Sequence, residues 1–370
     1  MTRREFQTSV LNFSAAAVFS RRAFAQSGDG ASDISELYRS ALVADSLCGP
    51  FADLTALPGP DLVATIRSSG ISLINCTVSD QTFEGTIDNI AQMQALVDKY
   101  PETFTIVRTH SDIGRAKQQE KLGIAQGFQY TAFLEQDPKR IATFRNLGVR
   151  IVQITYNKRN AWGGGSLDPA NTGLTEAGKS AVKQMNALGV AVDLSHSGYR
   201  TTGDAIAASE KPVLISHSGC AAIYPHPRSK PDAILKSLAD RGGYFGVYLM
   251  PYLVASPAVP TREDVLNHLV HAINVCGADH VGIGSDGSIQ KVVLTEAQKS
   301  AFDADIARRK QLGIGAPGED RYPYVPDVNG PDHMEIIATK LARRGQPASV
   351  IEKVLGANFA RVLGDIWQTA

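Results

Sequence analysis

The chain has 370 residues, of which 43% are apolar and 20% are charged, and it carries 37 basic and 37 acidic side chains. This length can bury a large core, either in one α/β domain or in two smaller ones. The balanced charge gives no reason to expect nucleic acid or an anionic membrane surface as a partner. No apolar run reaches the roughly 20 residues that a membrane-spanning helix needs, so we expect no transmembrane segment.

The N-terminus has the features of an export signal. Residues 2–6 (TRREF) resemble a twin-arginine motif, a weakly apolar stretch follows over residues 9–20, and residues 23–25 (AFA) form a small-x-small cleavage site. The alternative is a basic, frayed N-terminus. The pattern predicts a twin-arginine signal peptide over residues 1–26, a single folded domain over residues 27–370 and a periplasmic location.

The cysteines show no C-x-x-C spacing, which excludes a zinc ribbon. A periplasmic location permits a disulfide, but spacing does not reveal a pairing. We expect them to be buried small apolar residues. They are Cys48, Cys76, Cys220 and Cys276.

Short apolar runs alternate with amphipathic segments from about residue 32 onward. Continuous apolar runs suit strands that are buried on both faces, and their alternation with helices indicates a parallel sheet. Eight or nine such units fit a closed (β/α)8 barrel, in the TIM-barrel class, better than an open sheet. A Gly/Pro-rich stretch over residues 312–332 predicts a long loop over the barrel mouth. The runs cover residues 41–45, 71–78, 104–110, 122–128, 149–157, 189–196, 212–218, 244–250 and 280–286.

Polar residues stand at the ends of these runs, where barrel enzymes place their chemistry. Two successive runs end in Ser-His-Ser-Gly, which puts His196 and His217 within reach of one metal ion, with Asp286 opposite to manage a proton. Each could instead be structural: a hydrogen-bonded histidine, or an aspartate that caps a helix. Arg228 could bind a substrate carboxylate or only a neighbouring aspartate. The strand-end residues are Asp45, Cys76, Thr77, His110, Gln126, Tyr156, His196, His217 and Asp286.

Several long motifs, in order, resemble the membrane dipeptidase (renal dipeptidase) family of zinc peptidases, over about residues 38–366. The resemblance implies a (β/α)8 barrel of the metallo-dependent hydrolase type, with two zinc ions that together cleave dipeptides bearing a free C-terminal carboxylate. It implies that His196 and His217 bind one zinc, that Arg228 holds the substrate carboxylate, and that Asp286 takes part in proton transfer. The motifs cover residues 147–166, 173–198, 211–229, 277–286 and 351–363.

The chain departs from this pattern at the other ligands. The family begins its barrel with Asp-Gly-His-x-Asp, but Leu47 and Gly49 stand here in place of the histidine and the second aspartate. Gln126 falls where a glutamate should bridge the two metals, and Tyr156 falls where a histidine should polarise the scissile carbonyl. A bridge between two cations needs a carboxylate, so we expect the first zinc site to be lost.

The remaining donors predict a site for one zinc ion, held by His196 and His217 with a weak contribution from Gln126. Cys48 or Asp45 could supply a third ligand by local rearrangement, although a buried neutral thiol is the simpler expectation for Cys48.

The leading hypothesis is a divergent dipeptidase-like metallopeptidase whose small substrate has a free carboxylate. In it, Tyr156 polarises the carbonyl and Asp286 moves the proton. One alternative is an enzyme without zinc that performs proton transfer on an amino-acid-like substrate; another is a non-catalytic periplasmic binding factor. The family resemblance also implies that the protein could form a homodimer, and the sequence neither supports nor opposes this.

Overall fold

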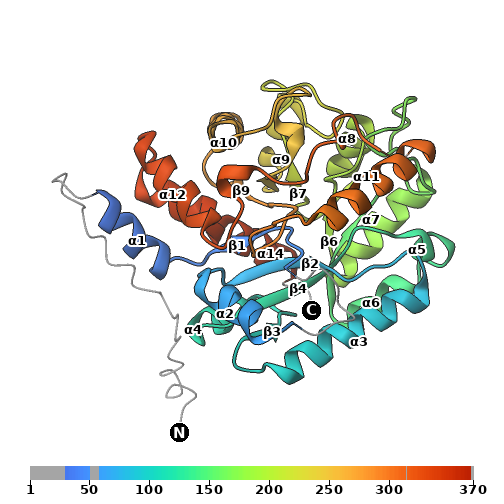
Figure 1. The fold of residues 1–370 in the computed structure, drawn as a ribbon. Coiled ribbons are helices and arrows are strands. Elements are labelled where there is room, and N and C mark those ends of the chain that lie inside the picture. Colours follow the sequence, from blue (N-terminus) through green and yellow to red (C-terminus); the bar gives the residue numbers. More distant parts are fainter. Residues whose placement is uncertain (1–29, 51–57, 314, 368–370) are drawn as a thin grey trace, which may run out of the picture.

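The computed structural model describes residues 30–50, 58–313 and 315–367, so the predicted signal peptide lies outside the described residues. A parallel β-sheet forms the centre, and helices surround it (Figure 1). Each strand falls within one of the predicted apolar runs, and each run contains a strand. They are β1 (Ala44–Asp45), β2 (Leu73–Thr77), β3 (Phe104–Ile106), β4 (Leu122–Phe128), β5 (Val149–Gln153), β6 (Ala191–Asp193), β7 (Leu214–Ser218), β8 (Tyr244–Val247) and β9 (Val281–Ile283).

The sheet curves into a barrel in the order β1-β2-β4-β5-β6-β7-β8-β9. The first and last strands meet through backbone hydrogen bonds, from Ser46 N to Ile283 O (3.0 Å) and from Asp286 N to Leu47 O (2.9 Å). The prediction of a (β/α)8 barrel is therefore confirmed.

The helices follow the strands as the sequence pattern predicts. Helix α7 illustrates the local reasons: the Thr175 side chain caps its first turn, Val182 and Met185 face the core, and Gly189 ends it with a φ of 63°. The helices are α1 (Gly30–Ser40), α2 (Pro60–Ser68), α3 (Phe83–Lys99), α4 (His110–Gln118), α5 (Ala132–Gln136), α6 (Arg140–Leu147), α7 (Glu176–Leu188), α8 (Tyr199–Ala208), α9 (Asp232–Asp240), α10 (Arg262–Cys276), α11 (Glu296–Gln311), α12 (His333–Arg343), α13 (Ala348–Glu352) and α14 (Asn358–Trp367).

Two helices close the end of the barrel where the strands begin. Strand β3 pairs only with the first half of β4, and the chain then enters α4. Ile113 of α4 and Leu363 of α14 belong to one buried cluster with Leu73 and Ala125 from the barrel strands. His110 begins α4 and lies against Gly364 of α14, so it is at this closed end and not at the barrel mouth, where we had placed it.

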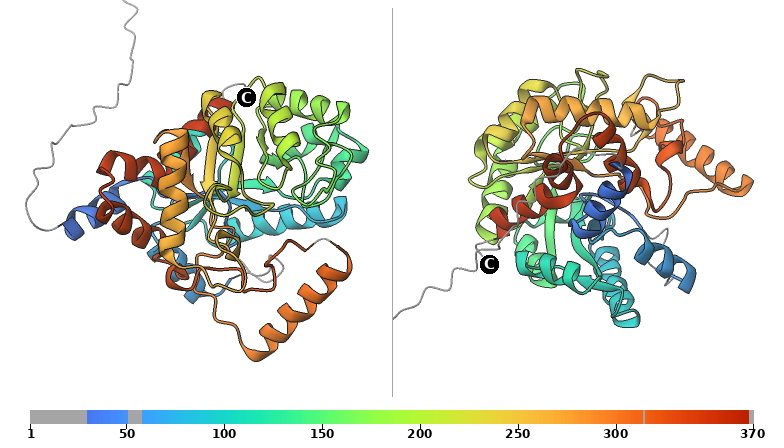
Figure 2. Two further views of the ribbon diagram at one scale, coloured as in Figure 1. Left: turned by 90° about the horizontal axis from the view of Figure 1, so that it is seen from above. Right: turned by 90° about the vertical axis from the view of Figure 1, so that its left-hand side faces the viewer.

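The loop over residues 315–332 reaches the opposite end of the barrel, as predicted. His226 Nε2 donates to Pro317 O across 2.7 Å, and Glu319 pairs with Arg309 of α11 at 2.9 Å. Helix α11 buries none of its side chains and projects from the body of the protein (Figure 2). Within the described ranges, no helix has the length and apolar character required to cross a membrane.

Candidate functional site

His196 and His217 follow neighbouring strands, and the structure brings their rings together. His217 is part of β7, and His196 stands just after β6. The two ring centroids are 5.0 Å apart, with 61° between the ring planes, and the side chains are 2% and 0% exposed. Both imidazoles therefore face one buried point at the strand ends.

Hydrogen bonds fix which nitrogen of each histidine is free. His196 Nδ1 lies 2.8 Å from Asn157 Oδ1, and His217 Nδ1 lies 2.8 Å from the Ser216 hydroxyl. Burial holds the pKa of both imidazoles well below the usual value, with the Arg228 charge adding to the effect, so both rings are neutral. An amide oxygen can only accept, and the Ser216 hydroxyl already donates to Asp193, so each Nδ1 carries the proton.

Each Nε2 is thus left with a lone pair and no hydrogen-bond partner in the described structure. Two buried, unpaired lone pairs are costly unless an electron-pair acceptor or a proton donor occupies the space between them.

Asp193 connects the two Ser-His-Ser loops, a role that the sequence analysis missed. Its Oδ1 accepts hydrogen bonds from the Ser195 hydroxyl (2.6 Å) and from Ser216 N (3.1 Å), and its Oδ2 accepts from the Ser216 hydroxyl (2.6 Å). The Ser195 hydroxyl also accepts from His217 N at 3.0 Å. The repeated serine before each histidine was the signal in the sequence that could have revealed this role, because Ser195 and Ser216 both hydrogen-bond Asp193.

Tyr156 covers one face of the histidine pair. Its ring stacks on His196 with centroids 4.1 Å apart and 18° between the planes, and Tyr130 packs against it at 4.9 Å. Burial raises the pKa of the Tyr156 hydroxyl well above its usual value, so the group stays a proton donor. Arg309 lies close enough to this hydroxyl to interact with it.

Arg228 is a buried cation that forms no close ion pair among the described residues, although its charge acts on the nearby Asp286 carboxyl. It is 2% exposed, its Nε has no hydrogen-bond partner, and its Nη2 makes only a long contact of 3.5 Å with His217 O. Within the described residues it forms no ion pair, so the structure does not show it holding a neighbouring aspartate. A buried guanidinium of this kind is a receptor for an anionic group.

Lys230, two residues further on, is fully buried as well and was not predicted from the sequence. Its Nζ donates to Ser197 O, next to His196 in the chain. Burial lowers the pKa of this amine to about 7, and the Arg228 charge acts in the same direction. The lysine thereby supports the loop that carries His196.

Asp286 stands at the end of the barrel, after β9, with a φ of 54°. No described residue hydrogen-bonds its carboxylate, and the next helix, α11, begins only at Glu296, so it is not a helix cap. Burial raises the pKa of this carboxyl to about 6, although Arg228 opposes the shift. A carboxyl of this kind can take up and release a proton near neutral pH.

Gln126 does not join the histidines. It lies on the same side of β4 as Ile124 and Phe128, which belong to the core between the barrel and its helices. Its Oε1 lies beside Gly148, 3.4 Å from where a Cβ would stand on that glycine. The inward neighbour is Gly127, so the strand presents no metal donor at this point, and the expected weak ligand is on the wrong face.

The end of β1 differs from the ends of β6 and β7. Leu47 is buried, and Asp45 Oδ1 accepts from Leu47 N (3.1 Å) and Ser285 N (2.8 Å). Asp45 Oδ2 lies 3.9 Å from His333 Nε2, and burial raises the pKa of this carboxyl to about 7. Burial also raises the pKa of the Cys48 thiol well above its usual value, so it is neutral.

Neither Leu47 nor Gly49 offers a side-chain donor at the end of β1. Among the described residues no three His, Cys, Asp or Glu side chains form a group that could hold a metal ion. All four cysteines are free and buried, as expected.

A cavity of about 490 Å³ lies next to Tyr156 and Asn157, the two residues that contact His196, although His196, His217 and Arg228 do not line it. Tyr156 and Asn157 line its inner wall, and Arg309 and Leu312 of the α11 region line its outer wall. A small molecule in this cavity would contact Tyr156 and Asn157, which separate it from His196.

The closed parallel sheet with surrounding helices is a (β/α)8 barrel, and its mouth gathers the two histidines, Arg228 and Asp286. The sequence profile described as Membrane dipeptidase (Peptidase family M19) matches residues 68–300. The chain belongs to this family.

Solved structures and curated relatives agree with this assignment. An amidohydrolase from Pseudomonas aeruginosa is 31% identical, with a TM-score of 0.79 over 90% of this chain and 99% of the other. A metallopeptidase structure named dipeptidase AC shares the fold, at 18% identity and a TM-score of 0.71, over 90% of this chain and all (100%) of the other. Dipeptidase verJ of Clonostachys rogersoniana is 27% identical over 77% of this chain and 66% of its own length. The chain thus spans slightly less than two thirds of that relative.

Proposed function

We propose that the protein is a divergent dipeptidase-type metallohydrolase that cleaves a dipeptide, or a similar small substrate with a free carboxylate, with the help of one zinc ion. The observation that carries the proposal is the pair of unpaired, buried Nε2 atoms on His196 and His217 beside a guanidinium without a counter-ion, that of Arg228. Membership of the membrane dipeptidase family supports the same reaction.

The described residues offer two protein ligands, one fewer than a catalytic zinc ion usually has, so the proposal is for one weakly held metal ion and not two. Two neutral imidazoles, each oriented through its Nδ1 by a second residue, are the arrangement that zinc ligands normally have. A second ion would need donors at Leu47 and Gly49 and a bridging carboxylate on β4, where Gln126 faces away. When bound, a zinc ion at the two histidines would polarise a carbonyl and make water a better nucleophile.

The chain's own residues would perform the other steps. Arg228 binds the free carboxylate of the substrate and so fixes which bond faces the histidines. Asp286, in its ionised form, takes a proton from the attacking water and returns it to the leaving amine. The Tyr156 hydroxyl, which stays protonated, donates to the carbonyl oxygen as negative charge develops on it.

The experiment combines metal analysis with an activity assay on the purified chain. We expect about one zinc per chain, hydrolysis of Ala-Ala or of a Gly-dehydroamino-acid dipeptide, and loss of both on treatment with a chelator. His271→Ala is the matched control for His196→Ala, because His271 lies away from the mouth and pairs with Asp232.

Two other outcomes would overturn the proposal. Turnover of an amino-acid-like substrate without metal would indicate the proton-transfer enzyme. Thermal stabilisation by a carboxylate ligand without any turnover would indicate a binding factor.

The periplasmic location through twin-arginine export and the homodimer remain proposals of the same kind. Cell fractionation of the wild type and an Arg3→Lys/Arg4→Lys variant tests the first, and light scattering of the mature chain tests the second.

A further inference from the structure

A second cavity, of about 600 Å³, opens at the end of the barrel opposite the histidines. Ser72, Thr103 and Leu122 mark its position, because they lie at the beginnings of β2, β3 and β4. Helices α1, α2, α4 and α12 complete its walls. None of the residues placed at the barrel mouth contributes to it.

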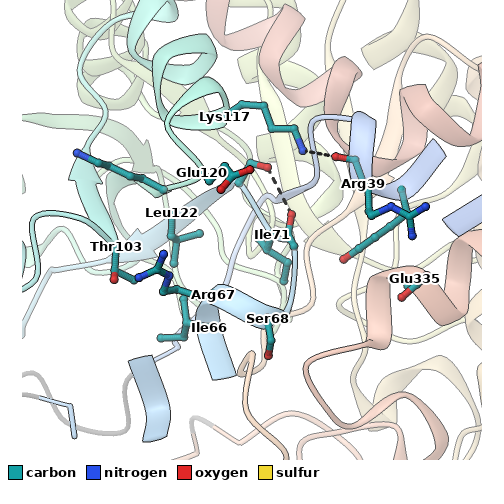
Figure 3. A pocket seen from close by; sticks show the side chains of 14 residues that line it. Arg39, Ile66, Arg67, Ser68, Ile71, Thr103, Lys117, Glu120, Leu122 and Glu335 are labelled. Atoms are coloured by element: carbon teal, nitrogen blue, oxygen red, sulfur yellow. Dashed lines mark hydrogen bonds between the residues drawn. The ribbon is translucent and has the colours of Figure 1, made fainter. Parts of the chain in front are cut away.

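Basic side chains come to this cavity from separate elements. Figure 3 shows Lys117 and Glu120 on one side, Arg39 and Glu335 on another, and Arg67 on a third. With Lys121 added, the lining carries four basic and two acidic side chains and is therefore positive.

The cations have almost no partners within the protein. Among the described residues none of the four forms an ion pair, and the side chains of Arg39, Arg67 and Lys121 donate no hydrogen bond. Lys117 donates only to the backbone oxygen of Arg39, at 2.8 Å. Burial lowers the pKa of the Lys117 amine, although Glu120 opposes the shift.

The two carboxylates compensate only half of this charge. Glu335 accepts a hydrogen bond from the Ser35 hydroxyl at 2.7 Å, and among the described residues neither Glu335 nor Glu120 forms an ion pair with the four cations. Positive charge around a concave surface without internal partners is expected to attract an anion from solution.

The floor of the cavity has an apolar part beneath its mainly polar lining. Ile66, Ile71 and Leu122 are buried beneath it, 1%, 5% and 3% exposed, and give it an apolar base. An apolar base with a few placed polar groups is the usual composition of a small-molecule site.

We propose that this cavity binds a small organic anion with at least two negative charges, held by Arg39, Arg67, Lys117 and Lys121 above the apolar floor. Its charges could be phosphate or carboxylate groups, since both accept hydrogen bonds from arginine and lysine. The site is separate from the barrel mouth and does not depend on the proposed hydrolase activity.

Isothermal titration of the full chain at low ionic strength tests the proposal, with AMP as the phosphate probe, citrate as the carboxylate probe and adenosine as the uncharged control. We expect one of the two anions to bind with a Kd on the order of 1 mM or tighter, to weaken as salt is added, and adenosine not to bind. Arg67→Gln and Lys117→Gln should each weaken binding by about tenfold.

Two control variants locate the bound anion. Arg228→Met removes the anion receptor of the barrel mouth and should leave this binding unchanged, and Arg241→Ala removes an exposed arginine elsewhere on the surface. The proposal is overturned if neither anion binds, if Arg67→Gln and Lys117→Gln have no more effect than Arg241→Ala, or if Arg228→Met abolishes binding.

Discussion

The barrel mouth has two halves that both leave buried polar atoms without partners but differ in the side chains that surround these atoms. After β6 and β7, hydrogen bonds to Asn157 and Ser216 satisfy one nitrogen of each histidine and leave the other bare. At the end of β1, Asp45 Oδ1 accepts from two backbone N–H groups, whereas Oδ2 has no hydrogen-bond partner among the described residues and lies 3.9 Å from His333 Nε2; Leu47 is packed into the core. The comparison teaches that a buried atom without a partner does not by itself mark a ligand position: after β6 and β7 two imidazoles converge, whereas the end of β1 carries Leu47 and Gly49 where further donors would be needed.

The largest effect should come from removing a histidine from the first half. His217→Ala should lower kcat/KM for a dipeptide by about a thousandfold or more and abolish zinc retention, because only two imidazoles face the site. Leu47→Ala, in the other half, should reduce the free energy of unfolding by about 2–5 kcal/mol and leave zinc content unchanged. Equal zinc loss in both variants would remove the distinction between the halves.

The pH dependence of the reaction should report Asp286. Its carboxyl has a pKa of about 6, raised by burial from an ordinary value of 3.8, and only the ionised form can accept a proton. We therefore expect kcat/KM to fall as the pH drops through about 6, and Asp286→Asn to lower the rate by about 10²–10⁴-fold and remove this acid limb. An unchanged acid limb in the variant would exclude Asp286 as the proton acceptor.

Arg228 should act on substrate selection. Arg228→Met should reduce kcat/KM for a dipeptide by about tenfold to a hundredfold, mainly through a higher KM, and have little effect on the corresponding dipeptide amide. Steady-state kinetics on both substrates, with Arg241→Ala as the control, measures this. A uniform loss on the acid and the amide would mean that the arginine acts on folding and not on the carboxylate.

Asp45 tests the β1 half through stability and not through catalysis. Because burial raises its pKa from 3.8 to about 7, the folded protein binds a proton that the unfolded chain releases between these pH values. The free energy of unfolding should therefore decrease as the pH rises from about 4 to 7, by at most about 4 kcal/mol from this group.

Asp45→Asn should abolish that decrease and raise Tm at pH 8 relative to the wild type. Thermal unfolding between pH 5 and pH 8, with the exposed Asp240→Asn as the control, checks the difference. A parallel pH dependence in the wild type and Asp45→Asn would show that Asp45 does not carry it.

The sequence predicted the strands well because each is a continuous apolar run, and it brought His196 and His217 together because equivalent ends of parallel strands share one edge. It failed for Gln126, since a displacement of one residue along β4 turns a side chain to the other face. It also missed Asp193 and Lys230, whose roles depend on partners in other loops. Composition and spacing cannot reveal such contacts.

The closure of the barrel floor by α14 has a consequence for how the protein is made. Phe359 and Leu363, near the end of the chain, share a cluster with Leu73 and Ala125, which are synthesised far earlier. The starts of the early strands are therefore shielded from water only after α14 packs against them. We expect the barrel to complete its packing after α14 has been synthesised.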